Sequence, residues 1–354
     1  MNNKKHLALI ILTGGVIGLL AVILTVMGNP PNMGICVACF IRDTAGALGL
    51  DAAANVQYIR PEIIGFILGA FLLSLFRKEF KPTGGSAPFV RFSVSFFVMI
   101  GALVFLGCPL RMVLRLAGGD LNALVGLAGF TFGIAVGAYF LKKGFSLGRA
   151  QNQPAVSGYI MPAIAVALLV FLIARPAFIK FSEEGPGSMH APLIIALLAG
   201  LTVGALAQRS RMCMAGGIRD LILIKNPSMA LGYLAIFAVA LVANIALSKF
   251  KLGFAEQPIA HTSFVWNFLG MTLVGYGSTL LGGCPLRQTI MAGEGNADAA
   301  ICFAGLLLGG ATAHNFGLAA SPAGVPVNGQ IAVIIGILFV SIIAFMNIRK
   351  RSVN

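Results

Sequence analysis

The amino-acid sequence predicts an all-α polytopic membrane protein, with about ten spans arranged as two inverted five-span repeats and with re-entrant half-helices. Three observations predict this fold class. Hydrophobic residues make up 58% of the chain and charged residues 10%, with a mean hydropathy of +0.93, which excludes an ordinary soluble domain. Apolar stretches long enough to cross a bilayer recur along the chain. One unusual motif occurs twice, half the chain length apart.

Ten apolar stretches are expected to cross the hydrocarbon core, which requires about 20 helical residues. Glycine pairs at helical spacing, such as Gly65 and Gly69, would let these helices pack closely. The first stretch is interpreted as a retained span, because no small-residue cleavage site follows it. The expected spans are 7–27, 61–76, 88–107, 120–141, 158–179, 191–208, 228–247, 264–283, 298–317 and 327–347.

The repeated motif is a Cys followed by an Ile-Arg-Asp triplet and, further along, by a Gly-Cys-Pro-Leu-Arg run. A repeat with such a long period indicates a duplicated domain rather than a short structural repeat. We therefore expect a first repeat at 1–180 and a second at 181–354. The motif residues are Cys36, Arg42, Asp43, Cys108 and Arg111 in the first copy and Cys213, Arg219, Asp220, Cys284 and Arg287 in the second.

The basic residues predict how the chain is oriented. Lys4-Lys5, the clusters at 77–81 and 142–149, and Arg349-Lys350-Arg351 fall on one face when ten spans are threaded. By the positive-inside rule this face is cytoplasmic and holds both termini. The net charge of +14 is explained by this topology, so no nucleic-acid partner is expected. Five spans per half would insert the two halves in opposite senses, as in inverted-repeat transporters.

Four further segments are expected to enter the membrane without crossing it. The stretches 33–50 and 211–224 are too apolar for loops, and irregular backbone at membrane depth requires a protein-lined cavity. Pro109 and Pro285 each suit the first position of a new short helix. The free N–H groups at such a helix start form a weak anion site. These four elements are expected to converge at a narrow waist.

The waist would hold the four motif Cys and four motif Arg. An intramembrane Arg is costly, so it is usually paired or faces a polar path. Asp43 and Asp220 are expected partners, while Arg111 and Arg287 have no adjacent acid in the sequence. Thiols are weak donors and polarisable acceptors, so thiols beside cations favour a small sulfur- or selenium-bearing anion. The alternative is that the Cys are structural and the Arg reach the headgroups.

Other chemistry has weaker support in the sequence. Cys36 and Cys39 have the spacing of a thiol–disulfide pair, but Gly216 replaces the second Cys in the other half, and no thioredoxin-like context surrounds the pair. Glu294 and Asp298 are expected to cap the following span. The sequence contains no ATP-coupling motif. We expect no catalytic residue, no metal site and no cofactor.

The duplicated Cys, Ile-Arg-Asp and Gly-Cys-Pro-Leu-Arg pattern resembles the YeeE/YedE family of bacterial inner-membrane sulfur-compound transporters, over nearly the whole chain. It is most similar to the YedE-like branch associated with selenium metabolism. The resemblance implies an hourglass-shaped helical protein, with Cys36, Cys108, Cys213 and Cys284 as relay residues. The chain departs from the thiosulfate-carrying branch, which the resemblance associates with three central thiols, in having a fourth paired thiol and the additional Cys39.

The sequence thus predicts a transporter, not an enzyme, in the bacterial cytoplasmic membrane. It would pass a small sulfur or selenium anion between central thiols, with Arg111 and Arg287 attracting the anion at opposite mouths. One alternative is a membrane thiol redox enzyme that uses Cys36 and Cys39. Another is a membrane partner that delivers sulfur or selenium to a cytosolic carrier protein.

Overall fold

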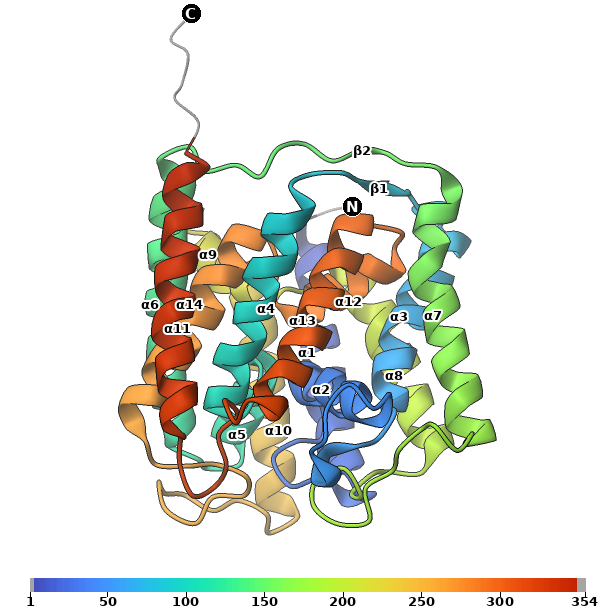
Figure 1. The fold of residues 1–354 in the computed structure, drawn as a ribbon, viewed down its shortest axis with the longest axis vertical. Helices are drawn as coiled ribbons and strands as arrows, with labels where there is room; N and C mark the ends of the chain where they lie inside the picture. Colours follow the sequence, from blue (N-terminus) through green and yellow to red (C-terminus); the bar gives the residue numbers. More distant parts are fainter. Residues whose placement is uncertain (1–2, 349–354) are drawn as a thin grey trace, which may run out of the picture.

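The computed structural model describes residues 3–348 and is a bundle of helices (Figure 1). The basic run Arg349-Lys350-Arg351 and Asn354, the expected cytoplasmic C-terminus, lie outside the described residues, as do residues 1 and 2. The long helices are α1 (Asn3–Val26), α3 (Pro61–Phe76), α4 (Pro88–Phe105), α6 (Asn122–Lys142), α7 (Ala155–Ala174), α8 (Leu193–Ser210), α10 (Ser228–Ala246), α11 (Phe264–Leu281), α13 (Ala297–Asn315) and α14 (Val327–Met346).

Four short helices, one 3-10 turn and two short strands complete the described fold. The two strands pair antiparallel with each other. The elements are α2 (Val37–Ala47), η1 (Ala54–Val56), β1 (Thr83–Gly84), α5 (Pro109–Ala117), β2 (Gln151–Asn152), α9 (Met214–Ile224) and α12 (Pro285–Gly293).

The predicted spans are confirmed. Among the described residues, ten helices are long and apolar enough to cross a membrane, and each overlaps one of the ten expected stretches. The largest shift is in the fifth, expected at 158–179 and observed as α7. That helix ends early because Arg175 adopts a left-handed conformation and Pro176 follows it.

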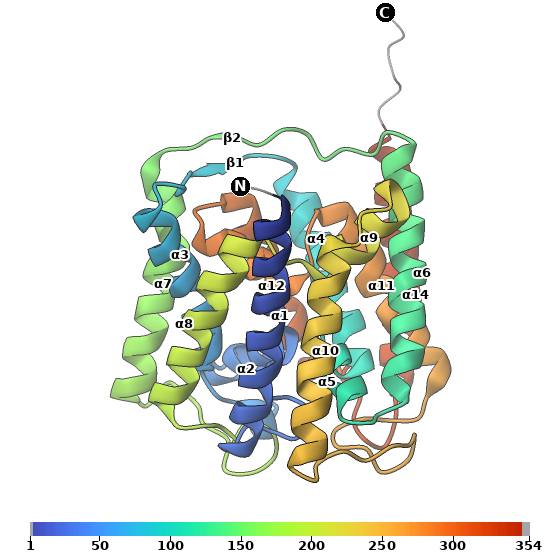
Figure 2. The ribbon, with the colours of Figure 1, turned by 180° about the vertical axis from the view of Figure 1, so that it is seen from behind.

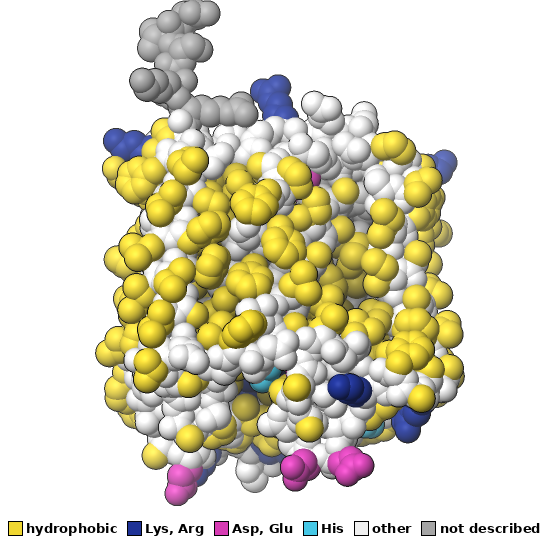
Figure 3. All heavy atoms as spheres, viewed as in Figure 1, with side chains coloured by type: hydrophobic (Ala, Val, Ile, Leu, Met, Phe, Trp, Pro, Cys, Tyr) yellow, Lys and Arg dark blue, Asp and Glu magenta, His cyan; other side chains and the backbone are white. Residues whose placement is uncertain are grey.

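The surface agrees with a membrane setting. Hydrophobic side chains cover the middle of the molecule, and the visible Asp and Glu side chains gather almost entirely at its lower end (Figure 3). We call the upper end in Figure 1, where α1 begins and α14 ends, the terminal face, and the lower end the far face. The expectation that the terminal face is cytoplasmic stays a prediction.

The long helices pack in pairs that join the two halves of the chain. The closest pairs are α1 with α10, α3 with α8, α4 with α13, and α6 with α11. At the α3–α8 crossing, a Cβ added at Gly65 would lie 2.6 Å from the carbonyl carbon of Gly200, so glycine is required for this approach. If each helix is replaced by its counterpart in the other half, the α1–α10 pair becomes α8–α3, and the α4–α13 pair becomes α11–α6. This supports the expected inverted repeats, whose boundary at residue 180 stays a prediction.

Three of the four short helices, α2, α5 and α12, are almost entirely buried, whereas α9 is buried only at its start. Helices α2 and α5 lie toward the far face, and α9 and α12 toward the terminal face (Figures 1 and 2). Each of the four expected re-entrant segments therefore contains one short helix. The fold thus places the N-terminal ends of two short helices from each face in the interior.

Candidate functional site

The four motif Cys occupy equivalent places, each immediately before a short helix. Cys36 and Cys213 are the N-cap residues of α2 and α9, with extended backbones at φ −140° and −145°. Cys108 and Cys284 are the N-cap residues of α5 and α12, with φ −80° and −71° and ψ 170° in both. A proline follows each of the latter two at the first helical position, as predicted. The local backbone is thus repeated in the two halves.

The structure brings three sulfurs together in the first half, and we call Cys36, Cys39 and Cys108 the first thiol group. The Sγ of Cys36 lies 2.7 Å from that of Cys39 and 3.9 Å from that of Cys108. All three residues are buried. The N–H of Cys39 donates to the Cys36 Sγ at 3.3 Å, so this sulfur also caps α2.

Two sulfurs meet in the second half, and we call Cys213 and Cys284 the second thiol group. Their side chains lie within interaction range of each other. The N–H of Met214 donates to the Cys284 Sγ at 3.3 Å, and the N–H of Gly216 donates to the Cys213 Sγ at 3.2 Å. Helix starts therefore direct backbone donors at these sulfurs, the arrangement that also favours an anion.

Three of the four motif arginines have acidic partners. Arg42 pairs with Asp43 at 2.5 Å and Arg219 with Asp220 at 2.8 Å, as the sequence suggested. Arg287 pairs with Glu294 at 3.0 Å, a partner seven residues away that the sequence analysis did not assign. The expectation that Glu294 and Asp298 cap the next span is wrong. Asn296 is the N-cap of α13.

Arg111 is different because the described residues offer it no acidic partner. Its guanidinium donates to the carbonyl oxygens of Asn32 at 3.0 Å, Ile259 at 3.1 Å and Leu106. Its Nη1 also lies 3.6 Å from the Sγ of Cys39. Arg111 therefore presents a buried positive charge to the first thiol group, held in place by neutral carbonyls.

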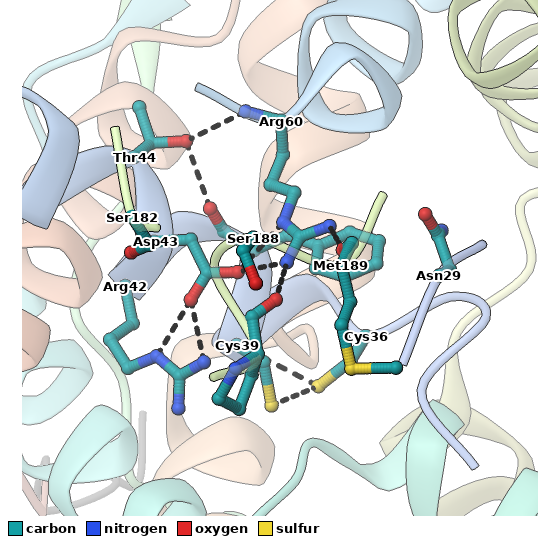
Figure 4. A network of polar contacts seen from close by, with 12 residues as sticks. Asn29, Cys36, Cys39, Arg42, Asp43, Thr44, Arg60, Ser182, Ser188 and Met189 are labelled. Atoms are coloured by element: carbon teal, nitrogen blue, oxygen red, sulfur yellow. Dashed lines mark hydrogen bonds and ion pairs between the residues drawn. The ribbon is translucent and has the colours of Figure 1, made fainter. Parts of the chain in front are cut away.

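Arg60 organises the surroundings of α2 and was missed by the sequence analysis. Its Nε donates to Asp43 Oδ2 at 2.7 Å, and its other nitrogens donate to the carbonyls of Pro186 and Met189 (Figure 4). Next to this loop, His190 stacks on Tyr58 with 4.2 Å between ring centroids, and burial lowers the pKa of His190. The only signal in the sequence was a basic residue directly before an apolar span.

Tyr233, on α10, was also missed by the sequence analysis. Its ring packs on the start of α9, where a Cβ added at Gly217 would lie 2.9 Å from Cε2 of the ring. Its hydroxyl is buried and has no hydrogen-bond partner among the described residues. A buried hydroxyl without a partner is costly, so its retention here suggests a transient partner. A Tyr inside an apolar span was the signal available in the sequence.

A cavity opens between α1, α5, α10 and the loop that follows α10, with a volume of about 320 Å³. Lys249 and Lys251 lie on its wall, and Asn32 and Gly34 form the side nearest the first thiol group. Because Arg111 donates to the Asn32 carbonyl, the guanidinium lies directly behind this wall. Glu256 also lines the cavity and pairs with Lys251 at 2.9 Å, so this basic rim carries one net positive charge.

The arrangement brings together groups with complementary chemistry. Thiol S–H groups can donate weak hydrogen bonds to sulfur, while guanidinium and helix-start N–H groups suit oxygen atoms of an anion. The first thiol group lies at the starts of α2 and α5, and the second at the starts of α9 and α12.

Comparison with known proteins gives matches to the C-terminal part and to shorter segments. Residues 209–351 match a family model described as sulphur transport. The thiosulfate transporter TsuA of Escherichia coli (strain K12) is 30% identical over 107 residues, which cover 30% of this chain and 30% of that protein. TsuA of Spirochaeta thermophila is 34% identical over 99 residues, covering 28% of this chain and 29% of the relative. The matched segment is less than a third of either relative.

Proposed function

We propose that this protein is a transporter of the YeeE/YedE kind, which carries a small sulfur anion across the membrane by passing it between the two thiol groups. The observation that carries the proposal is the placement of buried thiols at the starts of four short helices that approach from both faces. No bond to a Cys need form, because S–H contacts can exchange.

Thiosulfate is the substrate that the matches favour, since both named relatives are thiosulfate transporters. Its terminal sulfur would accept S–H donors, and its oxygens would accept from Arg111 and from backbone N–H groups. The selenium branch has no support from these matches, because neither the family description nor the relatives' names mention selenium. A selenium oxyanion would be recognised by the same donors, so it is compared directly in the test below.

The path runs from the far-face cavity to the terminal face. The basic rim and Arg111 draw the anion to Cys36 and Cys108. Tyr233 then donates to it, and Cys213 and Cys284 receive it. Arg287 and Arg219 lie beyond this point, while Arg42 shapes the first half through Asp43. With the far face outside a bacterial cytoplasmic membrane, this direction is uptake.

The burial of the thiols supports binding of a desolvated anion at this site. Cys36, Cys108 and Cys284 are at most 1% exposed, so the anion must leave water at the waist. A desolvated anion requires donors to replace its hydration, which the helix starts and Tyr233 supply. A carrier protein that receives the sulfur species inside the cell remains a separate hypothesis, which predicts no accumulation without that partner.

The test is flux into proteoliposomes loaded with purified protein, using labelled thiosulfate and labelled selenite. Wild type should accumulate thiosulfate, and Cys108→Ala and Cys284→Ala should each lose about tenfold or more of the initial rate, the effect of one or two lost contacts to a charged ligand. Cys302→Ala is the control, because this buried thiol belongs to neither thiol group and donates to the Arg91 carbonyl at 4.0 Å. Unchanged rates in both Cys variants would remove the thiols from the mechanism.

A further inference from the structure

We propose that Cys36 and Cys39 form a reversible disulfide that switches off passage through the first thiol group. The disulfide itself does not depend on the proposed function, whereas its effect on uptake does. The site is a modification site specific to the first half, and the oxidant is a small-molecule disulfide arriving through the far-face cavity.

The geometry of the pair carries the inference. The two sulfurs are 2.7 Å apart, closer than the 3.9 Å between the sulfurs of Cys36 and Cys108. Cys36 is the N-cap of α2 and Cys39 lies in its first turn, the placement in which a three-residue separation brings two sulfurs into bonding range. Both thiols are buried, and neither is in a disulfide with another Cys.

Arg111 provides the electrostatic condition for exchange. Its Nη1 lies 3.6 Å from the Cys39 Sγ, where it offsets the negative charge that the sulfur carries during thiol–disulfide exchange. Asn32 and Gly34, on the cavity wall, precede Cys36 closely in the chain. The cavity wall at Gly34 is therefore two residues from Cys36 along the chain.

The second half contains the matched negative control. Gly216 stands where the first half has Cys39, and the Cys213 Sγ accepts from the Gly216 N–H just as the Cys36 Sγ accepts from Cys39. A Cβ added at Gly216 would lie 3.1 Å from the Cys213 Cβ and 3.4 Å from its Sγ, so a second Cys requires a small shift of the Cys213 side chain. The asymmetry between the halves therefore lies mainly in one side chain.

The chemistry is a balanced exchange. The Cys39 thiolate, opposite Arg111, attacks one sulfur of a disulfide RSSR, the RS–SR bond breaks, and one RS⁻ leaves and takes up the Cys39 proton. The Cys36 thiol then gives up its proton and attacks the Cys39 sulfur of the mixed disulfide, and the second RS⁻ leaves and takes up the Cys36 proton. Two Cys thiols are oxidised and one RSSR is reduced to two RSH. A dithiol reductant reverses both steps.

Oxidation would remove a hydrogen-bond donor that the anion uses at the first thiol group. Cys36 would lose its S–H donor, and the link would fix the first turn of α2 beside Cys108. Cys39 would no longer be able to carry charge opposite Arg111. Uptake should therefore fall by about tenfold or more, as expected when a charged ligand loses a donor and the space beside it.

The experiment uses the full-length protein in proteoliposomes, treated with 2-hydroxyethyl disulfide and then with dithiothreitol. Peptide mass mapping after blocking free thiols should find Cys36 linked to Cys39, and uptake should fall and then recover. In Cys39→Gly, which copies the second half, the ratio of oxidised to reduced uptake should stay near one. Gly216→Cys should form a second link, to Cys213.

The possible results distinguish the disulfide itself, its effect on uptake and the proposed transport function. A Cys36–Cys108 link, or no link in wild type under conditions that oxidise Gly216→Cys, would overturn the proposal. If the Cys36–Cys39 link forms but the reduced protein carries no labelled thiosulfate, the proposed transport function fails while the modification site stands. If the link forms and uptake is unchanged, the switch is wrong. Cys39→Ser serves as a second variant if Cys39→Gly folds poorly.

Discussion

Helices α2 and α9 have the same local plan but opposite surroundings. Each begins after a Cys whose sulfur accepts a backbone N–H three residues on, and each carries the Ile-Arg-Asp triplet. All residues of α2 are buried, whereas only the first four residues of α9 are. Ile224, at the end of α9, is 67% exposed. The shared motif thus determines the N-cap of both helices but does not determine how much of each helix is buried.

The difference in burial between α2 and α9 follows from the ion-pair partners of Asp43 and Asp220. Asp43 accepts from Arg42 and Arg60, and Arg60 in turn donates to two carbonyls of a loop after α7. Asp220 has Arg219, with about a quarter of each side chain exposed. A buried carboxylate requires full compensation, and the first half supplies it with a second cation. The first half-helix is therefore fixed in place, and the second is held mainly at its start.

The largest expected effect is on stability at these two carboxylates. Asp43→Asn leaves Arg42 and Arg60 buried without their anion, which should destabilise the protein by about 3–5 kcal/mol. Asp220→Asn, at the matched position, should cost about 0–1 kcal/mol because the pair is partly solvated. Thermal unfolding in detergent measures both. Equal shifts in Tm would contradict the proposed difference in charge compensation between α2 and α9.

The next effect concerns the two Gly-Cys-Pro-Leu-Arg arginines. Arg111→Gln should lower the initial rate of thiosulfate uptake by about tenfold or more, because a buried cation without a carboxylate is lost. Arg287→Gln should have a smaller effect, since Glu294 already offsets its charge. Uptake is normalised to folded protein. A larger loss in Arg287→Gln would reverse the assigned roles.

A smaller effect is expected at Tyr233, on α10. Tyr233→Phe should reduce uptake by about five- to tenfold, the value of one hydrogen bond to an anion, while Tm stays equal or rises. The rise is possible because the hydroxyl has no partner to lose. Tyr139→Phe, at an exposed side chain on α6, is the control. A lower Tm with normal uptake would make Tyr233 a structural residue only.

The smallest effect is dynamic and needs no substitution. Backbone amides in the last turn of α9 should exchange with deuterium faster than those in the last turn of α2, because fewer buried contacts hold them. Hydrogen exchange measured by mass spectrometry on the reconstituted protein tests this. Adding thiosulfate should slow exchange at the start of α9, near Cys213. Equal exchange in both helices would mean that exposure does not report mobility here.

The sequence alone was sufficient for the elements and their starts. Long apolar runs set the ten spans, since a membrane helix must satisfy its own backbone. Cys before a triplet and Cys before Pro set the four short helices, because caps and proline act through neighbouring residues. These are local effects, so they can be read along the chain.

Only the tertiary structure decided which side chains meet. The contact of Cys36 with Cys108, the Arg287–Glu294 pair and the role of Arg60 all follow from helix packing across the two halves. Such contacts depend on how helices cross, and nothing at either position specifies its distant partner. Burial and charge compensation are properties of the packed bundle, so local sequence could place the thiols but could not show their surroundings.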